Sequence, residues 1–310
     1  MKRPIRFALF GNVYQPRKAA PMQQLLDALR QHEAEILIDT AFHRFLTEEL
    51  RLSVPTATCI EGNDFEADYV LSVGGDGTFL EAARRVAEKE IPILGINMGR
   101  LGFLSDFAPD DVGLAIRQIC EGHIRSEARS VLELQYSEGQ PAGHPYALNE
   151  VAVLKRDNSS MISIRVDING EYLTTYQADG LILNTPTGST GYALSVGGPI
   201  MHPGSATLGL VPVAPHSLNV RPVTLDDDME VTLTVESRSH NFLVAIDGRS
   251  ESCREGVRLL IRRAPFHVFV LKRPESSFFG TLRTKLMWGS DARESLTDSP
   301  LPTSPKGGSK

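Results

Sequence analysis

The order of apolar runs and amphipathic stretches constrains the fold of this chain more than any other feature. Short apolar runs at residues 5–10, 35–38, 69–73 and 91–96 alternate with helical patterns in the first 123 residues. Such alternation is typical of βα units, in which helices cover the faces of a parallel sheet. We therefore predict an α/β region with a parallel sheet at the start of the chain.

The pattern changes beyond residue 124, where strand patterns follow one another and helical patterns are scarce. The turn signal Asn169-Gly170 separates two of these runs, as in a β-hairpin. We predict an all-β, sandwich-like region. Its expected strands cover residues 131–136, 147–154, 161–168, 172–176, 230–235, 241–246, 257–262 and 267–271.

These two patterns predict the domain organisation. We expect an α/β domain over residues 1–123, completed by a segment at about 272–292 that returns to it, and a β-rich domain over residues 124–271. Residues 294–310 are mainly Ser, Pro, Gly and Lys, with little apolar surface to bury, so we expect a disordered tail.

Charge and cysteine content exclude several classes of protein. The 310 residues include 32 Lys and Arg against 38 Asp and Glu, giving a net charge of −6. An acidic chain disfavours a nucleic-acid or anionic-membrane partner. No apolar run reaches the roughly 18 residues of a membrane span, and the cytoplasm is the expected location. The three cysteines are far apart, so we expect neither a disulfide scaffold nor a zinc ribbon, and we assign no residue as a metal ligand.

A glycine-rich run, Gly74-Gly75-Asp76-Gly77-Thr78, lies between a predicted buried strand and a helix start. Glycines let backbone amides approach a phosphate, and a helix N-terminus favours negative charge. An acid in this position repels phosphate, but it suits a general base that takes the proton of an attacking hydroxyl. The alternative is a tight turn in which Asp76 caps the helix. After it, apolar residues recur with helical spacing at Phe79, Ala82, Ala83, Val86 and Ala87.

A second segment, residues 179–192, ends in Gly188-Ser189-Thr190-Gly191 followed by Tyr192. This sequence predicts a tight turn with two hydroxyls and free backbone amides, and Tyr192 offers an aromatic face for a base. A plain turn between two strands is the alternative.

These two segments resemble the signatures of a known family. The GGDGT run is shared by NAD kinases, diacylglycerol and sphingosine kinases, and phosphofructokinase-like enzymes, whereas residues 179–200 resemble the DGLI…TPTGSTAY segment of NAD kinases alone. The pair Asn149-Glu150 resembles the family's NE pair, and residues 94–104 and 280–288 also follow the family pattern. The matches span residues 70 to 290 in the family's order, so the resemblance is to the NAD kinase family.

The resemblance implies roles for individual residues. Asp76 would be the general base for the 2′-hydroxyl of the adenosine ribose, beside Gly77 in the nucleotide site. Gly74, Gly75 and Thr78 would complete the phosphate loop. Asn149 and Glu150 would hold ribose and adenine, and Asp179 would contact the second nucleotide. The adenine and ribose would be wrapped by Thr190, Gly191, Tyr192, Ala193, Leu194 and Ser195.

The resemblance also implies the reaction and its partners. The expected reaction is phosphoryl transfer from ATP, or from another nucleoside triphosphate or polyphosphate, to NAD, giving NADP. A divalent cation, Mg²⁺ by expectation, would offset the charge of the donor phosphates. The family is usually oligomeric through its β domain, so we expect a dimer or tetramer with a site completed by a neighbouring subunit. A lipid kinase and a silent dinucleotide sensor are the rival functions.

Five further residues either depart from the family pattern or have two possible roles. Gly191 lies where many members of the family have Ala, and Gln177 lies where some have Arg. Arg84 and Arg85 are expected on the outer, solvated face of the helix after the glycine loop, with a donor-phosphate contact as the alternative. Arg249, in the late loop Asp247-Gly248-Arg249, is expected to be a solvated hairpin residue, with a phosphate contact as the alternative.

Overall fold

The computed structural model describes residues 3–13, 19–99, 102–139, 141, 143–156 and 160–289. The chain forms two compact units, residues 1–274 and residues 275–310. The described part of the second unit contains the helix α6 (Phe278–Leu286), whose first turn is capped by Ser277 accepting a hydrogen bond from the Gly280 N–H at 3.1 Å. The predicted tail at 294–310 lies outside the described residues.

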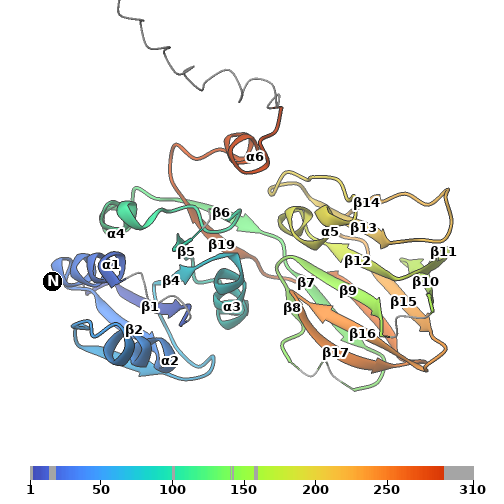
Figure 1. Cartoon of the computed structure of the whole chain (residues 1–310), viewed down its shortest axis with the longest axis horizontal. Coiled ribbons are helices and arrows are strands. Elements are labelled where there is room, and N and C mark those ends of the chain that lie inside the picture. Colours follow the sequence, from blue (N-terminus) through green and yellow to red (C-terminus); the bar gives the residue numbers. More distant parts are fainter. Residues whose placement is uncertain are drawn as a thin grey trace, which may run out of the picture. The chain divides into compact units, whose positions relative to one another are not determined.

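The first unit contains a seven-stranded, mainly parallel sheet with strand order β3-β2-β1-β4-β5-β19-β6 (Figure 1). Strand β19 runs parallel to β5, whereas β6 runs antiparallel to β19 at the edge. The strands are β1 (Arg6–Gly11), β2 (Glu35–Asp39), β3 (Ala57–Ile60), β4 (Tyr69–Gly74), β5 (Ile93–Asn97), β6 (Arg125–Arg129) and β19 (Val268–Lys272).

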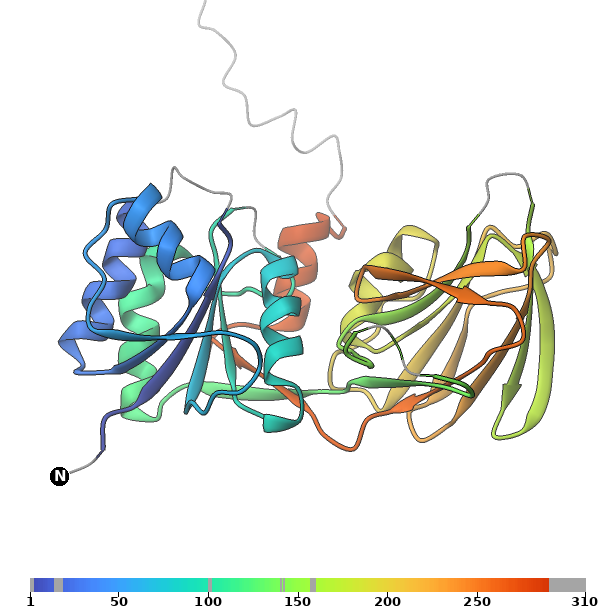
Figure 2. The same cartoon turned by 90° about the horizontal axis from the view of Figure 1, so that it is seen from below.

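Helices cover both faces of this sheet because successive strand residues point to opposite faces. In β1, Phe7 and Leu9 pack in one hydrophobic cluster with α1 and α4, whereas Ala8 and Phe10 pack in another with α3. Figure 2 shows α3 on the opposite face of the sheet from α1 and α4. The helical segments are α1 (Ala19–Gln31), α2 (Thr40–Arg44), the π-helix η1 (Phe45–Glu49), α3 (Asp76–Val86), the 3₁₀ turns η2 (Ala87–Lys89) and η3 (Pro109–Asp111), and α4 (Val112–Glu121).

Two six-stranded antiparallel sheets form the second region (Figure 1). One has the order β11-β10-β15-β18-β7-β8 and the other β14-β13-β12-β9-β16-β17. The strands of the first are β7 (Leu132–Tyr136), β8 (Tyr146–Ala147), β10 (Ile162–Ile168), β11 (Glu171–Ala178), β15 (Val231–Glu236) and β18 (Arg258–Arg263). Those of the second are β9 (Glu150–Lys155), β12 (Gly180–Asn184), β13 (Thr207–Val213), β14 (Val223–Asp226), β16 (Asn241–Ile246) and β17 (Arg249–Arg254).

The core of this region lies between the two sheets. Alternate residues of β10, namely Ile162, Ile164 and Val166, belong to the same cluster as Val151 and Val153 of β9. The outer face of the second sheet carries a smaller cluster, covered by α5 (Tyr192–Ser195), which follows the 3₁₀ turn η4 (Thr187–Thr190). The region is therefore a sandwich of two sheets.

The predicted fold class is confirmed, with an α/β region followed by antiparallel sheets. The strand expected at 147–154 is split at Leu148 and Asn149 into β8 and β9. The chain returns to the parallel sheet already at β19, and both β6 and β19 lie in the range expected for the β-rich region. The domain boundaries themselves stay a prediction. Within the described ranges, no helix is long and apolar enough to cross a membrane.

Candidate active site

Asp76 lies where β4 ends and α3 begins, and backbone amides hold its carboxylate. Oδ2 accepts a hydrogen bond from the Phe103 N–H at 2.8 Å, and Oδ1 accepts from the N–H groups of Leu104 and Ser105 at 3.2 Å each. The N-cap of α3 is Gly75, without a side-chain cap. Asp76 therefore does not cap its own helix; it binds the loop that follows β5.

Four glycines adapt the backbone to this arrangement in two different ways. A Cβ on Gly102 would lie 1.8 Å from Asp76 Oδ1, and one on Gly74 would lie 2.2 Å from Thr78 Oγ1. In contrast, a Cβ on Gly75 or Gly77 would meet no atom within 4 Å. Close packing thus requires Gly74 and Gly102, whereas the backbone at Gly75 and Gly77 is open to a ligand at the N-terminus of α3.

Asn149 and Glu150, at the start of β9, are positioned by a turn almost 100 residues later in the chain. The Asp247 carboxylate accepts hydrogen bonds from the N–H groups of Leu148, Asn149 and Glu150 at 2.8, 2.8 and 3.1 Å. Asp247 and Gly248 have φ angles of 47° and 78°, as a two-residue turn between β16 and β17 requires. Asp247 therefore fixes the backbone of the Asn-Glu pair.

Hydrophobic packing joins this pair to the glycine loop. Leu148, directly before Asn149, belongs to the same buried cluster as Phe79, three residues after Asp76 on α3. Both residues are at most 3% exposed. The glycine loop and the Asn149-Glu150 pair are therefore held by one hydrophobic core.

The turn at residues 185–192 packs directly on the Asn-Glu pair. The Thr185 N–H donates to the Asn149 carbonyl at 2.9 Å, and Thr185 Oγ1 donates to the Leu148 carbonyl at 2.6 Å. A Cβ on Gly188 would lie 2.1 Å from the Asn149 carbonyl oxygen. Ser189 is fully buried, and its hydroxyl bonds to the backbone of Pro186. The sequence predicts that the Ser189 hydroxyl is available in the turn. The structure shows that it stabilises the turn instead.

Several buried oxygens at this site have no hydrogen-bond partner among the described residues: Asn149 Oδ1, Glu150 Oε2, Asn184 Oδ1 and Thr187 Oγ1. Burial and the neighbouring Asp247 charge raise the pKa of Glu150 to about 7, although the Tyr192 N–H donates to this carboxylate. Buried acceptors are normally satisfied. The cluster is therefore arranged to receive hydrogen bonds from a ligand with donor groups.

Gly191 and Tyr192 border this cluster, whereas Asp179 does not. Gly191 lies against it, because a Cβ there would be 3.1 Å from Glu150 Oε2, and the Tyr192 side chain is 37% exposed. Asp179 instead forms an ion pair with Lys155 at 2.7 Å, before the first residue of β12, whereas Asn184 ends that strand. At ~3.3 Å per residue, Asp179 lies roughly 16 Å along the strand from Asn184. The remaining predicted residues, Thr190, Ala193, Leu194 and Ser195, lie in η4 and α5.

The sequence does not reveal the roles of two residues of the site, Asp247 and Gly102. Asp247 follows an apolar run and precedes Gly248, a hairpin signal that predicts the turn but not the carboxylate's partners. Gly102 lies in the segment that resembles the family pattern, and only the structure explains it. The solvated position expected for Arg85 is wrong: the residue is 8% exposed, and its guanidinium donates to Asp39 Oδ2 at 2.7 Å and lies over the Phe10 ring.

The described residues gather no group of three or more His, Cys, Asp and Glu side chains. Both oxygens of Asp76 already accept hydrogen bonds from backbone amides. The described side chains therefore do not by themselves provide a set of ligands for a divalent cation.

Comparison with known proteins assigns both regions of the chain. The model of the ATP-NAD kinase N-terminal domain matches residues 10–124, and that of the ATP-NAD kinase C-terminal domain matches residues 148–272. The chain belongs to the NAD kinase family. It is 58% identical to the NAD kinase of Bacteroides fragilis over 289 residues, covering 93% of this chain and all of that protein. It is 39% identical to the NAD kinase of Porphyromonas gingivalis over 288 residues, covering 93% and 99%.

Solved structures of NAD kinases share the fold. A yeast NADH kinase complexed with NADH has a TM-score of 0.84 at 21% identity, covering 94% of this chain and 90% of that one. An NAD kinase from Archaeoglobus fulgidus in complex with ATP has a TM-score of 0.72 at 25% identity, covering 90% and 99%. As an NAD kinase family member, the chain is an enzyme that phosphorylates NAD.

Proposed function

We propose that this enzyme transfers the terminal phosphoryl group of ATP to the 2′-hydroxyl of the adenosine ribose of NAD, giving NADP, with Asp76 as the general base. The observation that carries the proposal is the Asp76 carboxylate, fixed by three amides at the mouth of an open glycine loop. A carboxylate held in one orientation suits proton transfer, since positioning contributes much of the rate in phosphoryl transfer.

The acceptor side of the reaction rests on the buried oxygens. Asn149 Oδ1 and Glu150 Oε2 accept hydrogen bonds from ribose hydroxyls or the adenine amino group, which supply the missing donors. The exposed ring of Tyr192 provides a packing surface beside them. A dinucleotide bound in this way leaves its 2′-hydroxyl for Asp76.

The donor side uses the open backbone of the loop. Amides at Gly75 and Gly77 and the N-terminus of α3 attract the phosphates of ATP. The ribose oxygen forms the new bond to phosphorus, the bond to ADP breaks, and the hydroxyl proton moves to Asp76. The divalent cation belongs to the triphosphate, whose negative charge it offsets, because Mg²⁺ is commonly bound through substrate phosphates.

The position of Asp179 supports a second part of the proposal. Within one chain it lies at the far end of β12 from the Asn149 cluster. We therefore assign its nucleotide contact to the site of a neighbouring subunit, in a homodimer or homotetramer. Mixing Asp76→Asn chains with Asp179→Asn chains tests this: NADP formation above the mean of the two separate variants is expected, and strict averaging would contradict it.

Product analysis tests the reaction. Purified protein is incubated with Mg²⁺, NAD and either ATP or polyphosphate, and ³¹P NMR identifies the phosphorylated position. We expect the 2′-phosphate of NAD from ATP, with polyphosphate a poorer donor. Phosphorylation of diacylglycerol instead would establish the lipid-kinase rival, and NAD binding without turnover would establish the sensor.

Asp76→Asn tests the base assignment separately. The variant keeps the size of the side chain and one acceptor oxygen, but loses the basic carboxylate. Loss of a general base typically costs about 10² to 10⁴ in rate, and we expect a kcat loss in that range with NAD affinity retained. Normal turnover would overturn the role of Asp76 while leaving the reaction itself intact.

A further inference from the structure

A cluster of buried charges lies beside residues 103–105, whose amides hold the Asp76 carboxylate and which we call the Asp76 loop. Lys272, the last residue of β19, is 7% exposed, and Arg129 and Asp106 are 5% and 7% exposed. The Arg129 guanidinium pairs with Glu127, and the Oδ2 atom of Asp106 has no partner among the described residues. Two cations and one carboxylate are thus buried, beside the part-buried Glu127, and the proposed reaction gives none of them a role.

Lys272 connects this cluster to the loop that holds Asp76. Its Nζ donates to the Phe103 carbonyl at 3.4 Å, and the Phe103 N–H donates to Asp76 Oδ2 at 2.8 Å. The charged groups that act on Lys272 are Asp106, Arg129, Glu127 and Asp76. Burial lowers the pKa of Lys272, while the three carboxylates act to raise it. Burying an amine in this way is costly unless its charge is compensated and used.

We propose that Lys272 is a positioning residue for phosphoryl transfer, which holds the Phe103 carbonyl so that the amides of residues 103–105 clamp Asp76. Its ammonium group also provides a buried positive charge near the Asp76 carboxylate in its ionised form. The inference rests on the proposed role of Asp76. Lys272 touches neither Asn149 nor Glu150, so we expect its substitution to change the catalytic step and not NAD binding.

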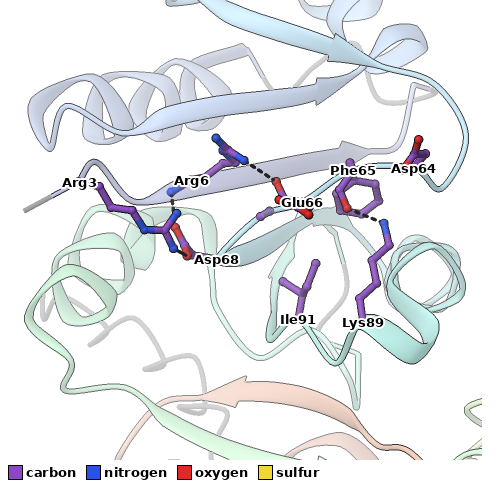
Figure 3. A pocket seen from close by; sticks show the side chains of 9 residues that line it. Arg3, Arg6, Asp64, Phe65, Glu66, Asp68, Lys89 and Ile91 are labelled. Carbon is purple, nitrogen blue, oxygen red and sulfur yellow. Dashed lines mark hydrogen bonds and ion pairs between the residues drawn. The ribbon is translucent and has the colours of Figure 1, made fainter.

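Lys89 provides a control for the loss of a lysine that donates to backbone carbonyls; it is exposed, whereas Lys272 is buried. The Lys89 Nζ also donates to two backbone carbonyls, those of Asn63 and Phe65, and burial likewise lowers its pKa. Figure 3 shows Lys89 with Phe65 in a depression that also contains Arg3, Arg6 and Ile91. This depression lies by the first residues of β1 and β4, whereas the Asp76 loop follows the last residues of β4 and β5. Losing Lys89 therefore removes an exposed amine that also donates to backbone carbonyls, without touching the Asp76 loop.

The experiment compares Lys272→Met, Lys272→Arg and Lys89→Met in steady-state assays with ATP and NAD. Methionine keeps the length of the side chain without its charge or its donors. Because small misplacements of a catalytic group cost up to about a hundredfold in rate, we expect Lys272→Met to lose about ten- to a hundredfold in kcat, with KM for NAD within about twofold of the wild-type value. Arginine should recover most of this loss, and Lys89→Met should leave kcat unchanged.

Two results would overturn the inference. One is a wild-type kcat in Lys272→Met. The other is a lower kcat accompanied by a higher KM for NAD and a lower melting temperature, none of which Lys272→Arg recovers. If Lys272→Met does not fold, Lys272→Gln, which keeps a donor but no charge, is judged by the same criteria. Asp76→Asn serves as the reference for the base. If that variant turns over normally, the proposed base fails and this inference with it; if it is inactive while Lys272→Met is normal, this inference alone fails.

Discussion

Two carboxylates of this enzyme lie at the first residue of an element, and their surroundings differ. Asp76 begins α3 and is part-buried, and both of its oxygens accept hydrogen bonds from backbone amides. Glu150 begins β9 and is 7% exposed; the Tyr192 N–H donates to it, but its Oε2 has no partner among the described residues. One carboxylate is complete without a ligand, and the other is not.

The difference separates the two tasks of the site. A carboxylate held by three amides keeps its orientation whether or not substrate is present, which suits a group that acts on the reacting atoms. A buried acceptor without a partner is costly until a ligand donor reaches it, which converts that cost into affinity and specificity. Changes near Asp76 should therefore reduce kcat, and changes near Glu150 should raise KM for NAD.

Gly102→Ala should have the largest effect. Its Cβ would lie 1.8 Å from Asp76 Oδ1, so the carboxylate or the loop must move. We expect a loss of about a hundredfold in kcat with KM for NAD nearly unchanged, measured by steady-state kinetics. Gly113→Ala in α4 is the matched control, because its Cβ would meet no atom within 4 Å. An unchanged kcat in Gly102→Ala would show that the orientation of Asp76 is not required.

Glu150→Gln should have the next largest effect, on binding. A hydrogen bond to a charged group contributes about 1.5–3 kcal/mol, so we expect KM for NAD to rise at least about tenfold while kcat changes little. Isothermal titration with NAD checks the affinity directly. A large fall in kcat at constant KM would erase the contrast with Asp76.

The same variant should be more stable than the wild type at alkaline pH. The pKa of Glu150 is raised from 4.5 to about 7 on folding, so the folded state binds more protons than the unfolded state in this range. Wild-type stability therefore falls as pH rises from about 4.5 to about 7. Relative to Gln, the cost should grow from below about 1 kcal/mol at pH 5 to about 3 kcal/mol at pH 8. Denaturant unfolding at the two pH values measures it, and parallel curves would contradict it.

Asp247→Asn should produce a smaller effect on NAD binding and change its pH dependence. Asparagine keeps one acceptor but brings its amide hydrogens toward three backbone donors, so we expect a loss of about 1–3 kcal/mol in stability. Removing the Asp247 charge also lowers the pKa of Glu150. If ionised Glu150 accepts the ligand donors, wild-type affinity for NAD rises through about pH 7, and the variant should show this rise at lower pH. An unshifted profile would exclude coupling between the two carboxylates.

Gly191→Ala should have the smallest effect. A Cβ there would lie 3.1 to 3.3 Å from Glu150 Oε2, the Gly188 carbonyl and Asn149 Nδ2, so these groups must shift only slightly. The φ angle of Gly191 is −93°, outside the left-handed region that favours glycine. We expect KM for NAD within about twofold and a stability change below about 1 kcal/mol. A tenfold effect would mean that the Glu150 cluster cannot adjust.

The sequence predicts those parts of the molecule that depend on local patterns. Apolar residues with helical spacing are buried on α3, namely Phe79, Ala82, Ala83 and Val86. The pair Asp247-Gly248 forms a turn. The partners of the two carboxylates could not be predicted, because Asp76 bonds to residues 27–29 positions away and Asp247 to residues 97–99 positions away. Such contacts depend on how strands are ordered in sheets, which periodicity does not encode. The same reason hid the buried ion pair of Arg85 with Asp39, 46 positions away.

The most direct test of the separate roles of Asp76 in catalysis and Glu150 in NAD binding is to measure kcat and KM for NAD in Asp76→Asn and Glu150→Gln. NAD affinity is measured independently for each variant. We expect Asp76→Asn to lose at least about a hundredfold in kcat and to bind NAD as the wild type does, whereas Glu150→Gln should lose affinity at nearly normal kcat. The opposite assignment, or the same loss of both parameters in the two variants, would contradict it.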